Sequence, residues 1–202
     1  MRGDQYVVAL ALIEEGRVVV AGLAAPRLGI DLRPRPNPDG CIVVAVRGQG
    51  AWAAPLDGGE ERQLHVSECR EASQARLLRS VEDQHTDPVR LARIAERLRL
   101  TRSPVPIDSQ AKYLMIAGGE AELLVRLLPS ATPSYKEKLW DVAAGLLVVE
   151  EAGGCVTDLE GRPLDLTAGR ELARNRGSLI SNGHLHDRVL SAVSAVLNEA
   201  LA

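Results

Sequence analysis

The chain has 202 residues, of which 46% are hydrophobic and 25% charged, as is usual for one large globular domain or two small ones. This composition excludes disorder, collagen or coiled coil over the whole chain, and no apolar run reaches the ~20 residues of a membrane-spanning helix. The 27 acidic residues outnumber the 24 basic ones, so the net charge of −3 argues against a broad nucleic-acid surface but allows a small anionic ligand held by a few cations.

The first third of the chain predicts antiparallel strands. Two Val-rich apolar stretches, 6–13 and 17–25, flank a Glu-Glu-Gly turn, and we expect them to be adjacent buried strands. Residues 26–40 hold four prolines and predict a surface loop. Further strands are expected at 41–46, 48–54 and 62–66.

Beyond residue 67, strands alternate with helices. Asp87-Pro88 is a helix start, because an N-cap residue is followed by proline at the first helical position. Other strands are expected at 75–81, 105–108, 122–128 and 178–181, and other helices at 109–117, 141–152 and 184–201. This order predicts an α/β fold: the remainder of a mostly antiparallel N-terminal sheet domain at residues 1–70, then an α/β domain with a mixed sheet at residues 71–202.

The cysteines indicate the redox environment. Cys41, Cys69 and Cys155 are odd in number and far apart, and no Cys-x-x-Cys motif occurs. Free thiols in a reducing compartment are the expected state. We therefore expect a cytoplasmic protein, with an organelle as the open alternative.

A possible cation ligand precedes the helix expected from residue 141. Asp141 is followed by Ala143, Ala144 and Gly145, small residues that let another group approach the helix start closely. An aspartate in this place is most often an N-cap, but its carboxylate can also bind a hard cation such as Mg²⁺. One carboxylate does not make a magnesium site by itself.

Three further segments carry groups suited to an anion. Ser109 and Lys112 share a helix face near a helix start and could cradle a phosphate, or be a cap and a surface lysine. Arg126 lies in an apolar run and needs a partner there, either a carboxylate of this chain or a ligand phosphate. His85 follows a strand end, where a histidine is usually an ordinary polar loop residue.

The order of these segments resembles the inositol monophosphatase-like phosphatases. Trp-Asp-Val-Ala-Ala-Gly at 140–145, followed by Glu-Ala-Gly-Gly at 151–154, looks like the C-terminal signature of that superfamily. Within it, four stretches are similar to the 3'(2'),5'-bisphosphate nucleotidases, so that the resemblance spans essentially the whole chain. These stretches are 2–12, 80–82, 108–113 and 135–141.

The resemblance implies an activity and roles for particular residues. It implies Mg²⁺-dependent, lithium-sensitive removal of the 3'-phosphate of adenosine 3',5'-bisphosphate, a step linked to sulfate assimilation, with AMP as product. It also implies that Asp141 ligates the metal, and that a second phosphate favours Arg126 where enzymes acting on inositol monophosphates carry an acidic residue. The implied substrate-binding residues are His85, Ser109, Lys112, Arg126 and Asp141.

One part of the family pattern is not found in the sequence. The main metal site of the family uses an Asp-Pro-Ile-Asp-Gly-Thr loop, which does not occur here. We therefore expect the chain to begin inside the first domain, to hold no complete catalytic set, and to be inactive by itself with an exposed strand edge at 6–13. Two alternatives stay open: a nucleotide-binding remnant without catalysis, and an inositol-phosphate phosphatase. The oligomeric state is not predicted.

Overall fold

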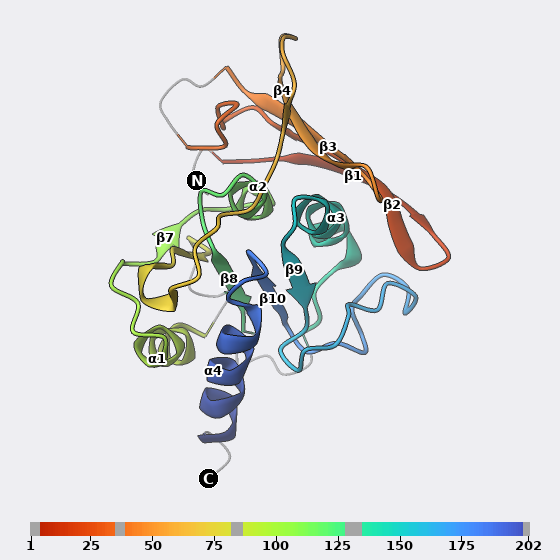
Figure 1. Cartoon of the computed structure of the whole chain (residues 1–202). Helices are drawn as coiled ribbons and strands as arrows, with labels where there is room; N and C mark the ends of the chain where they lie inside the picture. Colours follow the sequence, from red (N-terminus) through yellow and green to blue (C-terminus); the bar gives the residue numbers. More distant parts are fainter. Residues whose placement is uncertain (1–4, 35–38, 82–86, 128–134, 200–202) are drawn as a thin grey trace.

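The computed structural model describes residues 5–34, 39–81, 87–127 and 135–199. Within these ranges the chain forms two five-stranded sheets. Figure 1 shows helices between the sheets and beyond the second one. The predicted α/β class is confirmed.

The first sheet is antiparallel throughout, in the order β1-β2-β3-β4-β5. The predicted hairpin between the first two strands is confirmed, since Glu15 (φ 49°) and Gly16 (φ 75°) adopt the positive φ angles of a tight hairpin turn. The strands are β1 (Val8–Glu14), β2 (Arg17–Ala25), β3 (Cys41–Val46), β4 (Gly50–Pro55) and β5 (Arg62–Gln63).

One face of this sheet is buried and the other is apolar but exposed. The prediction that residues 6–13 form a buried strand is wrong: β1 lies at the sheet edge, and Leu10 is 76% exposed. The run is apolar on both faces of the strand, but within the described ranges helices cover only one of them (Figure 1). We call the uncovered side the outer apolar face; its exposed residues are Val8, Leu10, Leu12, Val20, Ile42, Val44 and Trp52.

The second sheet is mixed, as predicted, in the order β7-β6-β8-β10-β9. β6 runs parallel to both β7 and β8, whereas β10 is antiparallel to β8 and β9. β9 was not predicted from the sequence. The strands are β6 (Leu77–Arg79), β7 (Val105–Pro106), β8 (Leu123–Arg126), β9 (Cys155–Thr157) and β10 (Ser178–Ser181).

Two pairs of helices cover the second sheet, one on each face (Figure 1). Helices α2 (Ala111–Ala117) and α3 (Ala143–Glu151) lie between the sheets, and almost every residue of both is buried. Helices α1 (Pro88–Arg97) and α4 (His186–Glu199) pack on the far face. Neighbouring residues of β6, β8 and β10 alternate between the two faces, so each of these strands contributes to both cores.

The core between the sheets is continuous. It joins β2, β3 and β4 of the first sheet to α2, α3 and the second sheet. This core continues across the predicted domain boundary at residue 70, and the division into two domains stays a prediction. All three cysteines are free thiols, and no helix in the described ranges combines the length and apolarity needed to cross a bilayer.

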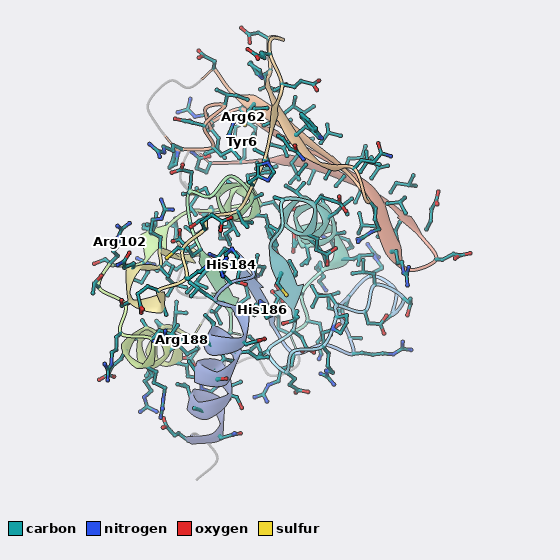
Figure 2. All side chains as sticks on the ribbon, viewed as in Figure 1. Tyr6, Arg62, Arg102, His184, His186 and Arg188 are labelled. Atoms are coloured by element: carbon teal, nitrogen blue, oxygen red, sulfur yellow. The ribbon has the colours of Figure 1, made fainter. Side chains whose placement is uncertain are left out.

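His186, at the start of α4, joins β9 to β10 (Figure 2). Its Nε2 lies 2.9 Å from Thr157 Oγ1 and its Nδ1 lies 2.8 Å from Ser181 Oγ. Because the Thr157 hydroxyl donates to the Asp158 carbonyl, it accepts from Nε2, which leaves Nδ1 to accept from Ser181. Burial lowers the pKa of His186, so this neutral arrangement is the favoured one.

Candidate functional site

The topology of the second sheet brings distant segments to one edge. β6, β7 and β8 are parallel neighbours, so their carboxyl ends meet on the same side. Ser80 and Val81 follow β6, the 107–112 segment follows β7, and Arg126 is the last residue of β8. Parallel strands thus gather segments that are up to about 45 positions apart in the sequence, which local patterns could not show.

Lys112 is buried at this edge. Its side chain is only 4% exposed, and Nζ donates to the Ile107 carbonyl over 3.2 Å. Burial and the nearby positive charge of Arg126 lower the pKa of Lys112 to about 8. The alternative of a surface lysine is therefore wrong, because α2 is enclosed between two sheets. A buried ammonium with no carboxylate in direct contact among the described residues can receive an anion.

Arg126 has a partner within the chain, which is one of the two alternatives that the sequence left open. Its Nε lies 2.7 Å from Glu137 Oε1, and the two side chains are 18% and 2% exposed. Burial raises the pKa of Glu137, although Arg126 acts in the opposite direction. Glu137 Oε2 and Arg126 Nε are both buried without a hydrogen-bond partner among the described residues, so the 2.7 Å contact is an ion pair and not an aligned hydrogen bond. The pair therefore leaves polar groups unsatisfied, which is unusual away from a binding site.

Ser109 occupies a strained turn between β7 and α2. Its φ of +59° lies in the left-handed region, which is uncommon for a residue with a side chain. Its hydroxyl accepts from the Ala111 N–H over 3.3 Å, and the helix itself starts at Ala111, two residues later than predicted. The adjacent Asp108 accepts from Val81 through Oδ1, whereas its Oδ2 is buried without a described partner. Strain and an unpaired oxygen at one turn are typical of functional loops.

Asp141 does not cap α3, so that prediction is wrong. It ends a short 3₁₀ turn (Leu139–Asp141), and Val142 precedes the helix with no side-chain cap. The free N–H of Gly145 in the first helical turn donates instead to Gln110 Oε1 over 2.9 Å. Gln110 also donates to the Trp140 carbonyl, so it joins the two family motifs. The Asp141 carboxylate is left exposed, with no hydrogen bond or ion pair to another described residue.

The small residues at the start of α3 admit a close neighbour, as predicted, and that neighbour is Tyr113. A Cβ on Gly145 would lie 2.3 Å from Tyr113 Cγ. The ring is 2% exposed and its hydroxyl has no hydrogen-bond partner among the described residues. Burial raises the pKa of Tyr113, with Glu137 acting in the same direction. The hydroxyl is therefore neutral and available as a donor.

Together these groups form a buried cluster that holds two cations. Lys112 and Arg126 contribute two positive charges, Glu137 contributes a buried negative charge, and the carboxylates of Asp108 and Asp141 act on Lys112 from the edge of the cluster. The Lys112 ammonium, which has no ion pair among the described residues, and the unpaired hydroxyl of Tyr113 fit an anion such as a phosphate. We call Lys112, Arg126, Glu137 and Tyr113 the phosphate cluster.

Comparison with known proteins identifies the fold family. The model of the inositol monophosphatase family matches residues 1–198. The chain belongs to this family. The IMPase of Thermotoga maritima shares the fold with a TM-score of 0.68 and 25% identity, over 96% of this chain and 62% of that one.

Relatives within the inositol monophosphatase family carry a more specific name. A Schizosaccharomyces pombe protein is 37% identical over 202 residues, which is 98% of this chain and 57% of the relative. An Oryza sativa protein is 38% identical over 205 residues, covering 98% of this chain and 56% of the relative. Both are named 3'(2'),5'-bisphosphate nucleotidase. The chain thus spans a little over half the length of these relatives.

Metal binding by this family member was expected at Asp141. Among the described residues, no three His, Cys, Asp or Glu side chains lie together as a metal cluster. Asp141 supplies one carboxylate, and its neighbours do not by themselves fit Mg²⁺, which favours oxygen ligands in octahedral geometry. Its role as a ligand stays a prediction, as does that of His85, which lies outside the described residues.

Sequence reasoning missed Glu137, Gln110 and Tyr113. Glu137 stands between Lys136 and Lys138, a pattern that usually marks an exposed charged segment. Gln110 and Tyr113 lie in the 108–113 stretch, and the sequence predicts no role for either of them. A signal was present only for Glu137, because Arg126 in an apolar run required a partner, and a carboxylate of this chain was one of the two alternatives.

Proposed function

We propose that this chain binds adenosine 3',5'-bisphosphate as the substrate-recognition part of a phosphomonoesterase that removes the 3'-phosphate and gives AMP. The observation that carries the proposal is the phosphate cluster, in which Lys112 is buried with no ion pair among the described residues, beside Arg126 and the unpaired hydroxyl of Tyr113. The names of the 33–38% identical relatives support the substrate class.

The chemistry of the residues supports a role in recognition. Lys112 and Arg126 neutralise phosphate charge and orient it by charge-assisted hydrogen bonds. The Ser109 hydroxyl adds a neutral contact at the same edge of the sheet. Asp141 would be one ligand of a Mg²⁺ ion whose other ligands are not among the described residues, and the chemistry such an ion supplies is polarisation of the phosphate ester and activation of water. Recognition is therefore testable apart from turnover.

Binding separates a bisphosphate site from an inositol-phosphate site. By isothermal titration calorimetry we expect the chain to bind adenosine 3',5'-bisphosphate more tightly than inositol monophosphate. Arg126→Ala should weaken the bisphosphate about 10- to 150-fold, the worth of one charge-assisted contact, and the monophosphate little. Equal loss for both ligands would contradict the assignment and favour the inositol-phosphate alternative.

Turnover separates an enzyme from a nucleotide-binding remnant. The remnant is favoured by one observation, the absence of Asp-Pro-Ile-Asp-Gly-Thr from the sequence. We expect the 202-residue chain with Mg²⁺ to release no phosphate at an enzymatic rate, because placement and activation of the water must coexist. Release near ~1 per second that disappears in Asp141→Asn would contradict this expectation.

A further inference from the structure

Glu137 contacts Arg126 from one side of the guanidinium. Nε is the nitrogen in closest contact, at 2.7 Å from Oε1, and no other carboxylate of the described residues forms an ion pair with Arg126. A guanidinium presents a fork of N–H donors, so an ion pair on the Nε side leaves the two Nη groups available, although Nε itself forms no aligned hydrogen bond among the described residues. We propose that Glu137 is a positioning residue, which holds Arg126 so that its Nη groups meet the second phosphate of the ligand; this rests on the proposed function.

Two hydrogen bonds hold Glu137 itself in place. Its carbonyl accepts from the Leu172 N–H over 2.9 Å, and Ser178 Oγ donates to Oε1 over 3.3 Å. Its neighbours are fixed as well, since Lys136 Nζ donates to the Asn175 carbonyl and Lys138 pairs with Glu171. Ser178 lies directly opposite Arg126 in the β8–β10 ladder. One rigid register thus sets both the anchor and the arginine.

A purely electrostatic role would predict the opposite effect of substitution. If Glu137 only reduced the positive charge of the cluster, removing its charge would strengthen binding of an anion. If it positions Arg126, removing the anchor frees the guanidinium to rotate, and binding weakens in spite of the gain in net positive charge. The sign of the change therefore distinguishes the two roles.

The chain offers a matched control. Glu122 is also a buried carboxylate, 3% exposed, paired with a partly buried arginine, Arg76, at 2.8 Å. This pair is not part of the phosphate cluster, so Glu122→Gln removes a comparable ion pair from another place. It reports the loss of stability that any such substitution causes.

The test is calorimetric titration of the 202-residue chain with two ligands, adenosine 3',5'-bisphosphate and adenosine 3'-monophosphate, which lacks the second phosphate. Glu137→Gln should weaken the bisphosphate about tenfold and the monophosphate less than about twofold. Glu137→Asp keeps the charge but is one methylene too short, so it should also weaken the bisphosphate. Glu122→Gln should change neither affinity while lowering the melting temperature.

Each outcome decides the proposal. Unchanged or tighter bisphosphate binding by Glu137→Gln, or full retention by Glu137→Asp, would overturn the positioning role while leaving the proposed function intact. No saturable binding by the unmodified chain would overturn both. If the Glu137 variants do not fold, Ser178→Ala removes only the hydroxyl that holds Oε1. Ser178→Ala should then weaken binding of the bisphosphate alone by about two- to threefold, which is about the contribution of a weak hydrogen bond. Unchanged bisphosphate affinity in this variant would overturn the positioning role.

Discussion

Gly145 is the position at which the packing of the site is most sensitive to one added atom. A Cβ there would lie 2.3 Å from Tyr113 Cγ and 2.7 Å from both Cδ atoms of the ring. Carbon atoms in ordinary contact are ~3.5 Å apart or more, so the ring or the helix must move by about 1 Å. The Tyr113 side chain is 2% exposed and enclosed by α3 and the second sheet, which leaves no free space to move into.

The magnitude follows from two opposing effects. Replacing glycine by alanine inside a helix ordinarily stabilises it by about 1 kcal/mol. Overpacking a well-filled core costs about 1–3 kcal/mol. Because a separation of 2.3 Å is far inside the ordinary contact distance, we take the upper part of this cost, about 2–3 kcal/mol. We therefore expect Gly145→Ala to destabilise the chain by about 1–2 kcal/mol, which lowers the melting temperature by roughly 2–8 °C for a chain of this size. The sign is the opposite of the one that helix propensity predicts.

The assay is thermal unfolding followed by circular dichroism, with Gly22→Ala as the matched control. A Cβ on Gly22 meets no atom within 4 Å, so this variant should be neutral or slightly stabilised. In a Tyr113→Leu background, Gly145→Ala should lose most of its cost, because the two positions are coupled through direct contact. A Gly145→Ala variant at least as stable as the unmodified chain would refute the packing argument.

Three further predictions concern other parts of the molecule. Leu10→Glu on the outer apolar face should change the free energy of unfolding by less than about 0.5 kcal/mol and reduce self-association in sedimentation velocity, whereas Leu23→Glu, at a fully buried position, should unfold the chain. Burial holds the pKa of His186 below its ordinary value in the folded state, so the unfolded chain binds a proton more readily. The free energy of unfolding should therefore fall as the pH drops below ~6.5. His186→Gln should reduce this pH dependence, measured by urea unfolding between pH 7 and 5. Lys112→Met should raise the free energy of unfolding at pH 7 by about 1–3 kcal/mol, because a buried charge is removed, while abolishing bisphosphate binding in calorimetry; a variant that is destabilised and still binds would contradict both parts.

The sequence by itself determined the elements whose signals are local. The Glu-Glu-Gly turn predicted the first hairpin, and the positive φ angles of Glu15 and Gly16 confirm it. Asp87 followed by proline predicted the start of α1, where Asp87 Oδ1 accepts from the Arg90 N–H. The alternation of strands and helices beyond residue 67 predicted the mixed sheet. The residue motifs also led to the inositol monophosphatase family, which the family match confirms. The roles of Ser109, Lys112, Arg126 and Asp141 stay predictions.

Only the tertiary structure decided which of these residues are buried and what they contact. Lys112 looks like a surface lysine and Asp141 like a cap, because a local pattern records the residue types and not the sheet packed over them. The enclosure of α2 between two sheets buries Lys112, and the side chain of Gln110 takes the capping contact and leaves Asp141 exposed. Glu137 reaches Arg126 across about ten positions of sequence because β8 and β10 hold the arginine and Ser178 in one register. Such contacts depend on chain segments that meet only after folding, which is why the sequence could require a partner for Arg126 without naming it.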